Sequence, residues 1–334
     1  MKTLKDNGIF KKGVLLKLGI HGVADTKRAK PNGRLLQEGI PSHLVYVNFK
    51  IIPSNYLNPV KQVENKVRDY IREREIKIDV PGFHYIPKSF VPEVVDTLKK
   101  FQKEYKEIAN KWLIEKYDEW KAKIEGENPK TAGLIPKKDY LEKAFFIEYS
   151  FVELSPPSTI GDVLDKDLYG EELEKFSNTI DRAATLAHVG VREEMLGVVE
   201  DAVERLGYQK EEETEEIQKK IFRNTLVKDF QNFWNLVPRK NIFGDSKIEI
   251  IASGMQELLK GDIEKVSGKL RKENNFRINV HIRLLETFKE IGSDIVNMNM
   301  DYKSYIPEET LTRASTAAAI TIRPDPPPII DSGE

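Results

Sequence analysis

Five histidines and several neighbouring carboxylates are the residues of this sequence whose types could support chemistry. No histidine lies three or four residues from another, so a metal site would require distant parts of the chain to converge. His188 lies in an alanine-rich stretch, and His21 and His84 lie near turns. Single histidines in such places more often pack or face solvent than act in a site. We therefore predict no metal ligand and no cofactor.

Two carboxylate pairs raise the question of general acid–base catalysis. Such catalysis needs two carboxyl groups in a cleft, in unlike environments. The pairs are Glu193 with Glu194 and Glu200 with Asp201, and basic residues lie close to both on amphipathic segments. That pattern is typical of a salt-bridged helix face. A hydrolase whose carboxylates meet only on folding stays open as a third interpretation, but we predict no catalytic residue.

The short motifs of common enzyme families are missing. The sequence has no G-x-x-x-x-G-K-[ST] loop, no strand-linked G-x-G-x-x-G, no G-x-S-x-G and no H-E-x-x-H. It also lacks cysteine, which excludes disulfides, thiolate nucleophiles and zinc–thiolate sites. These absences favour a protein that is not an enzyme.

An aromatic stretch with nearby cations, residues 222–234, could bind single-stranded nucleic acid. Bases would stack on its rings while the cations contact phosphates. The cations for which we predict a contact with nucleic acid or a protein partner are Arg223, Lys228, Arg239 and Lys240. The alternative is that Phe222, Phe230 and Phe233 fill a helical core. Their helical spacing favours this alternative.

The composition suits elongated helices that each bury one stripe. The chain has 334 residues, 40% hydrophobic and 32% charged, with a formal net charge of -1. That balance argues against a protein whose whole surface binds nucleic acid or an anionic membrane. No window approaches the roughly 18 apolar residues of a membrane span, and the first residues lack a convincing signal-peptide cleavage site. We expect a cytoplasmic protein without a membrane partner.

The first part of the chain is predicted to contain the β-structure. Residues 1–58 form a strand-and-loop region, with strands near 14–20 and 44–52, and residues 145–154 form a further strand. Residues 59–154 as a whole hold a short helix, a long helix and this last strand. The short helix, at 59–74, carries a stripe of Val60, Val63, Val67 and Ile71.

The apolar positions of the predicted long helix run from residue 94 to residue 124, and Gly126 and Pro129 end the helix. It starts as a heptad seam that runs from Val94 to Trp112 in steps of three and four residues, as in a coiled coil. A displaced register then begins at Leu113 and continues to Ile124. Such a helix would be about 33 residues and close to 50 Å long, too long to be buried within a small globule.

Residues 155–306 are predicted as a helical hairpin and bundle, followed at 307–334 by a short helix and an extended or mobile tail. The hairpin has a helix at 171–206, a tip with the acidic run after Gly207, and a return helix at 214–237. The fold class we predict is mainly α, with elongated antiparallel helical hairpins or a bundle and a small β element.

The order of these features resembles a mainly helical family encoded by phages and plasmids. The matching landmarks are KVRDYIRE, VPGFHYIPKSF before the long helix, EKYDEW at its end, FFIEYSFVEL and NLVPRKNIFGD. They span most of residues 40–270. The family looks to be encoded next to AAA ATPases of the MoxR type and von Willebrand A-domain proteins. The resemblance therefore implies an accessory or substrate role in a chaperone-like remodelling system, and it supplies no catalytic residue.

The leading hypothesis is a non-enzymatic helical scaffold or adaptor of a phage or mobile element, acting with protein partners such as that ATPase system. A homo-oligomer is plausible but not required, because one chain can satisfy both sides of a heptad seam. The alternative is a protein that binds single-stranded or duplex nucleic acid in mobile-element replication or recombination, through the basic and aromatic residues near 223–240.

Overall fold

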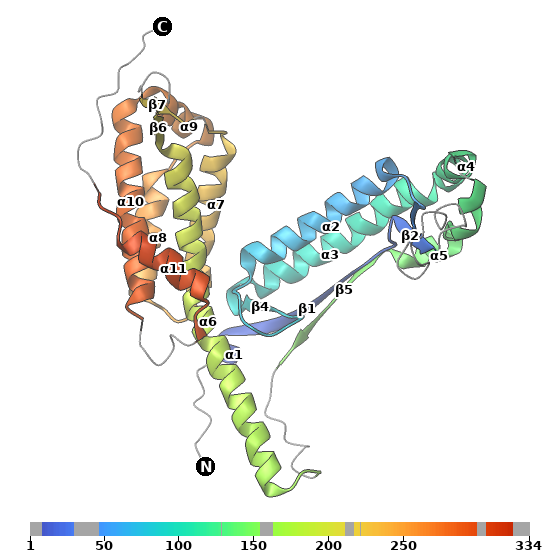
Figure 1. The fold of residues 1–334 in the computed structure, drawn as a ribbon, viewed down its shortest axis with the longest axis horizontal. Helices are drawn as coiled ribbons and strands as arrows, with labels where there is room; N and C mark the ends of the chain where they lie inside the picture. The colour runs from blue at the N-terminus through green and yellow to red at the C-terminus, as the bar shows by residue number, and fades with distance from the viewer. Residues whose placement is uncertain are drawn as a thin grey trace, which may run out of the picture. The chain divides into compact units, whose positions relative to one another are not determined.

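Helices form most of the described chain, with a few short strands between them (Figure 1). The computed structural model describes residues 9–29, 47–127, 129–153, 163–210, 217–220, 222–298 and 305–322. The strands are β1 (Gly13–His21), β2 (Thr26–Ala29), β3 (Val47–Lys50), β4 (His84–Pro87), β5 (Phe146–Val152), β6 (Tyr208–Lys210) and β7 (Ile217–Lys219). Within these ranges they form three small sheets, ordered β4-β1-β5, β2-β3 and β6-β7. The predicted mainly α fold class with a small β element is confirmed.

The predicted strands correspond to three of these elements. β1 confirms the strand near 14–20, and β5 confirms the strand within 145–154. β3 covers residues 47–50 of the strand predicted at 44–52, and residues 44–46 lie outside the described ranges. β2 and β3 pair antiparallel, with Thr26 opposite Lys50.

The helices follow the apolar stripes of the sequence. They are α1 (Ile9–Lys12), α2 (Ser54–Arg74), α3 (Val91–Ala109), α4 (Tyr117–Glu127), α5 (Lys138–Ala144), α6 (Lys166–Leu206), α7 (Thr225–Lys240), α8 (Ser246–Leu258), α9 (Ile263–Lys272), α10 (Asn274–Val296) and α11 (Glu308–Ala318). None of these described helices combines the length and the apolar composition that a membrane crossing requires.

The chain divides into two compact units, each made of separated stretches. Unit 1 consists of residues 1–15, 73–89 and 153–334, and unit 2 consists of residues 16–72 and 90–152. β1 contributes its first three residues to unit 1 and the others to unit 2. The sequence suggested four consecutive segments, with boundaries near 58, 154 and 306, whereas each unit combines stretches from several of them.

In unit 2, α2 and α3 lie side by side and antiparallel (Figure 1). Their side chains meet in reverse order along the two helices, at Tyr70–Glu93 (3.2 Å), Lys66–Glu104 (3.1 Å) and Glu64–Tyr105 (2.7 Å). The predicted stripe of α2 is confirmed, because Val60, Val63, Val67 and Ile71 are all buried. The helix begins five residues before the predicted start, on a first turn in which the Pro53 carbonyl accepts from the amides of Tyr56 and Leu57.

A π-helical turn divides the predicted long helix. α3 ends at Ala109, the turn occupies Asn110–Ile114, and α4 starts at Tyr117. The Glu115 amide donates to the Asn110 carbonyl, five residues earlier, at 2.9 Å. A π turn inserts one residue into the helical repeat, and this explains why the apolar stripe moves from Trp112 to the fully buried Leu113. The predicted change of register is confirmed, but the prediction of one unbroken helix is wrong.

In unit 1, α6 to α11 form a helical bundle (Figure 1). The apolar stripe predicted at the end of the bundle is buried on α10, through Leu284, Phe288, Ile291 and Ile295. α8 and α9 are separated at Gly261, whose φ of +125° favours glycine. α11 confirms the short helix predicted after Pro307, and residues 323–334 of the tail lie outside the described part of the chain.

The tip of the predicted helical hairpin contains a β-ribbon. α6 ends at Leu206 as predicted, but β6 and β7 follow and pair antiparallel. The return helix α7 therefore starts at Thr225 and not at residue 214.

Candidate functional site

The first part of α6 is the element of unit 1 that extends furthest beyond the packed helices (Figure 1). The helix has 41 residues and is therefore about 60 Å long at 1.5 Å per residue. Asp165 caps its start, accepting from the amides of Asp167 at 3.1 Å and Leu168 at 3.0 Å. Residues 166–179 contain no buried residue, whereas buried positions begin at Ile180. We call residues 163–179 the α6 arm.

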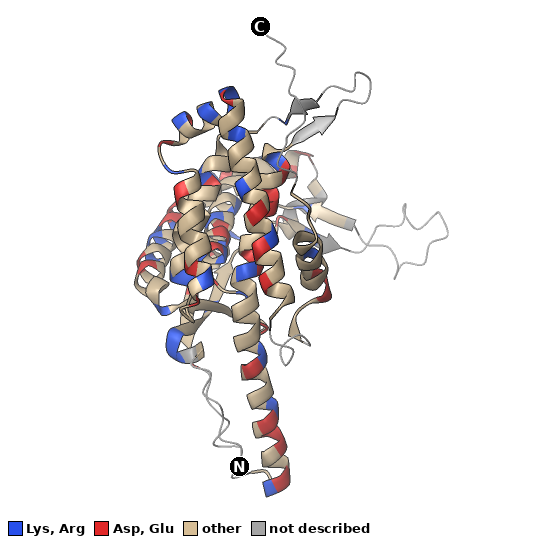
Figure 2. Cartoon of the chain, turned by 90° about the vertical axis from the view of Figure 1, so that its left-hand side faces the viewer, with Lys and Arg blue, Asp and Glu red and all other residues tan. Residues whose placement is uncertain are grey.

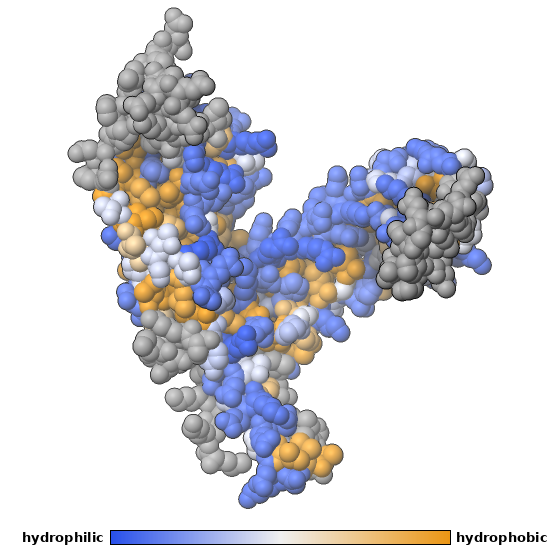
Figure 3. Space-filling view, in the orientation of Figure 1, coloured by the Kyte–Doolittle hydropathy of each residue, from blue (hydrophilic) through white to orange (hydrophobic). Residues whose placement is uncertain are grey.

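The arm carries apolar side chains on the same stripe as the buried part of the helix. Tyr169, Leu173 and Phe176 are half-buried and continue in steps of three and four into Ile180 and Ala183, which are buried. At the start of the arm, Val163 is 83% exposed and Leu168 is 48% exposed. Figure 3 shows hydrophobic residues gathered at this end of α6. An apolar stripe that leaves the core in this way is typical of a helix that packs on a partner.

Acidic residues surround this stripe. Residues 165–182 contain six acidic residues and three basic ones, so that their net charge is about −3. Figure 2 shows the red residues along this helix. Lys175 pairs with Glu172 at 2.6 Å on the arm itself. Arg182 pairs with Asp79 at 2.5 Å and so joins the base of the arm to the stretch 73–89 of unit 1. The arm is therefore an acidic, amphipathic helix.

Buried ion pairs hold α6 where it enters the bundle. Lys240 is 2% exposed, and its ammonium lies 2.5 Å from a carboxylate oxygen of Glu194. Burial raises the pKa of Glu194, although Lys240 acts in the opposite direction. Nearby, Arg192 contacts Asp245 at 2.5 Å. Burial tends to raise the pKa of Asp245, but the hydrogen bond and the charge of Arg192 bring it below the ordinary value. These pairs join the buried part of α6 to the end of α7 and to Asp245, the residue before α8.

The carboxylates considered for catalysis are each engaged by a partner. Glu194 pairs with Lys240, as above. The other contacts are Thr310 hydroxyl to Glu193 (3.0 Å), Arg313 to Glu200 (2.6 Å) and Arg205 to Asp201 (2.7 Å). Three of these four carboxylates form salt bridges, as expected, whereas Glu193 accepts a hydrogen bond from a hydroxyl group. Their arrangement ties α11 to α6 and does not present two free carboxyl groups to a substrate.

The three histidines considered in the sequence each contact another side chain. His188 stacks on Phe243 with ring centres 3.6 Å apart, and burial lowers its pKa. His21 lies 2.9 Å from Glu148, and His84 contacts Glu75. Within the part of the chain that the structure describes, no three residues of the types His, Cys, Asp and Glu are grouped so that they could hold a metal ion.

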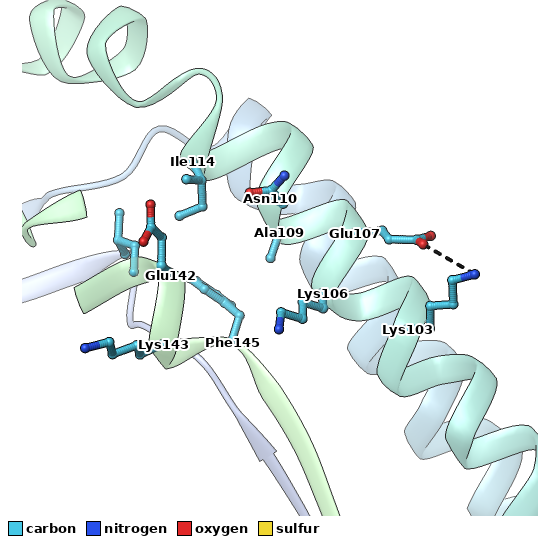
Figure 4. Close-up of a pocket in the computed structure, with 10 residues that line it drawn as sticks. Lys103, Lys106, Glu107, Ala109, Asn110, Ile114, Glu142, Lys143 and Phe145 are labelled. Atoms are coloured by element: carbon cyan, nitrogen blue, oxygen red, sulfur yellow. Dashed lines mark ion pairs between the residues drawn. The ribbon is translucent and has the colours of Figure 1, made fainter. Parts of the chain in front are cut away.

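A cavity of about 680 Å³ in unit 2 lies between α3, α5 and the π-helical turn (Figure 4). Its floor is apolar and includes Ala109, Ile114 and Phe145. Glu107 is directed along α3 toward Lys103, at 3.8 Å, whereas Glu142 comes from α5 on the other wall. The cavity therefore does not bring two carboxylates together for acid–base catalysis.

The four cations predicted as contacts are not on one surface. Arg223 and Lys228 are exposed, at the start of α7. Arg239 donates to the backbone oxygen of Ser89 at 2.6 Å, and Lys240 is buried against Glu194. The rings that might have stacked bases are largely in the core: Phe222, Phe230 and Trp234 are buried and Phe233 is half-buried. The geometry favours the packing interpretation of this aromatic helix.

Sequence reasoning missed a buried arginine beside these rings. Arg277 is 2% exposed and donates to the carbonyls of Leu206 at 2.9 Å, Gly207 at 3.2 Å and Lys220 at 2.8 Å. It joins the end of α6 to the end of the β-ribbon. The sequence feature that could have revealed it was its position, three residues before Val280 and therefore on the apolar stripe of α10.

No protein-family model, curated protein or solved structure matches this chain.

Proposed function

We propose that this protein is a non-enzymatic helical scaffold or adaptor of a phage or mobile element, and that the α6 arm is its main docking surface for protein partners. The observation that carries the proposal is the apolar stripe of the arm. It runs from the buried core of the bundle onto a helix segment without a buried residue. When a second helix covers apolar side chains in such a position, they are removed from water and the free energy falls.

The chemistry of the arm indicates the kind of partner. The stripe of Tyr169, Leu173 and Phe176 fits a second amphipathic helix, because rows three and four residues apart interlock. The excess of acidic residues around the stripe favours a partner helix with basic flanks. The resemblance in the sequence supports a partner in a remodelling system with a MoxR-type AAA ATPase and a von Willebrand A-domain protein. Self-association through the same stripe is a further part of the proposal.

The test is a capture experiment with the full chain and with the two proteins of that system. The arm variant carries Leu168→Glu and Phe176→Glu, which place one charge beside the stripe and one on it, without changing a buried residue. We expect the unaltered chain to retain a partner or to show a mass above the monomer in light scattering. We expect the arm variant to lose that association.

The matched control is Ile250→Glu. Ile250 is also in unit 1 and is 69% exposed, but it lies on α8. Circular dichroism establishes that both variants keep the helical content of the unaltered chain. A strictly monomeric chain that retains neither protein contradicts the proposal, as does a loss of association that is equal in the arm variant and the control.

A further inference from the structure

The solvent-facing side of α9 carries a row of lysines. Val266, Ser267 and Leu270 are buried and form the side of the helix that faces the bundle. Lys265, Lys269 and Lys272 are exposed, and their spacing of four and three residues places them in one row. Figure 2 shows blue residues along this helix at the top of the bundle. No described carboxylate forms an ion pair with any of the three ammonium groups, and Lys269 lies 5.9 Å from the ring centre of Phe276.

Arg271 connects this row to the start of α7. Its guanidinium donates to the Phe222 carbonyl at 3.3 Å and also to the side chain of Asn224. Arg223 is the residue between these two acceptors, and Lys228 follows Asn224 by one helical turn. Both are exposed. We define the basic patch as Arg223, Lys228, Lys265, Lys269, Arg271 and Lys272.

Acidic residues near the patch are fewer and are partly engaged. Among the described residues of α7, α9 and the positions that flank them, the acidic ones are Asp229, Asp262, Glu264 and Glu273. Asp262 caps α9 by accepting from the Lys265 amide at 3.0 Å, so that its charge is directed at the helix start. On and beside these two helices, the six cations of the patch therefore outnumber these four described carboxylates. The balanced charge of the whole chain hides this local excess.

The surroundings of the patch decide which polyanion it fits. The exposed large hydrophobic residues of the described chain lie on other elements: Tyr140, Phe146, Phe151, Val163, Leu168 and Ile250. Without such residues at the patch, binding to an anionic membrane would not be strengthened by insertion of apolar side chains. The aromatic residues of α7 are mainly buried, so a single strand would find few rings on which to stack its bases. What is left is contact between cations and phosphates.

We propose that the basic patch binds the phosphate backbone of duplex nucleic acid without sequence preference. Lysine is a point charge on a flexible stem and contacts phosphates without reading bases. The patch shares no residue with the α6 arm, so this inference goes beyond the scaffold function. It moves the site expected at residues 223–240 to α9 and the first turn of α7, with Arg223 and Lys228 as the shared residues.

The experiment is a fluorescence anisotropy titration of the full chain with labelled duplexes of two unrelated sequences, at salt concentrations from about 50 to about 200 mM. Six phosphate contacts predict a slope of log Kobs against log salt of about −5. The triple variant Lys265→Gln, Lys269→Gln, Lys272→Gln removes three contacts and should reduce the slope by about 2.7. Both duplexes should bind alike.

The matched control is Lys99→Gln, Lys100→Gln, Lys106→Gln. These three lysines are exposed on α3 in unit 2, and their replacement gives the same change of net charge. It should keep the slope of the unaltered chain, and so should the arm variant of α6. The proposal is overturned by absence of duplex binding at the lowest salt, by equal effects of both triple variants, or by an oligo-dT single strand that binds more tightly than the duplexes. Binding to phosphatidylserine vesicles in preference to the duplexes would also overturn it.

Discussion

Removal of Lys240 from its buried pair with Glu194 should be the most damaging single change among the ion pairs of the buried part of α6. The ammonium is 2% exposed and lies 2.5 Å from the Glu194 carboxylate. In Lys240→Met the carboxylate stays buried without its cation, and breaking a buried pair in this way costs about 3–5 kcal/mol. Because burial already raises the pKa of Glu194, the carboxyl group should then take up a proton, which limits the loss.

The double variant Glu194→Leu with Lys240→Met should recover most of this loss. Replacement of both partners by apolar side chains of similar volume is often neutral or even stabilising, because neither charge then has to leave water. We therefore expect the double variant to unfold within about 1 kcal/mol of the unaltered chain. The cycle of single and double variants would give a coupling energy of several kcal/mol.

Urea denaturation is the assay, with the free energy of unfolding followed by far-ultraviolet circular dichroism and by tryptophan fluorescence. Trp234 is buried six residues before Lys240 on α7 and contributes to this signal together with Trp112 and Trp120. The reasoning predicts a large loss for each single variant and a small one for the double variant. It is refuted if Lys240→Met costs less than about 1 kcal/mol, or if the losses of the single variants simply add.

Three further predictions concern unit 1. Gly292→Ala should cost about 1–3 kcal/mol, because the new Cβ would lie 2.6 Å from the Ala314 carbonyl oxygen in α11; an unchanged urea midpoint would contradict this close packing. Arg277→Met should cost about 3 kcal/mol or more, since three carbonyls lose their donor and each buried unsatisfied group costs about 1–3 kcal/mol; faster amide exchange at the end of α6 is the second readout. Burial lowers the pKa of His188, so the unfolded chain binds a proton more readily and stability is lost as the pH falls below 6.5. His188→Gln should flatten the fall in unfolding free energy between about pH 7 and pH 5, and an unchanged slope would count against that burial.

The parts of the fold that periodicity could predict are those in which one apolar stripe meets one neighbour. The stripes of α2 and α10 are buried where the sequence places them. The heptad seam even located the displaced register near Trp112. It could not show that a π turn causes the displacement or that α3 and α4 are separate helices, because a stripe with one extra residue looks the same in both cases.

Features that depend on long-range contacts could not be predicted from the sequence. The division into units brings residues 73–89 to the bundle of unit 1, and no local pattern indicates that. Lys240 was expected on a surface, but its partner Glu194 is 46 residues away in sequence and could not be identified by spacing. Arg271 links the cations of α7 to those of α9 through contacts that only the folded chain reveals.

Hydrogen–deuterium exchange of the α6 arm tests the central claim most directly. The arm, residues 163–179, lacks buried residues, so its amides should exchange rapidly in the isolated chain compared with those from Ile180 onward. When the chain binds its partner or a second copy, we predict that exchange slows in the arm, and that the Leu168→Glu, Phe176→Glu variant abolishes this protection. An assembly that forms while the arm exchanges as fast as before would contradict the claim that it is the docking surface.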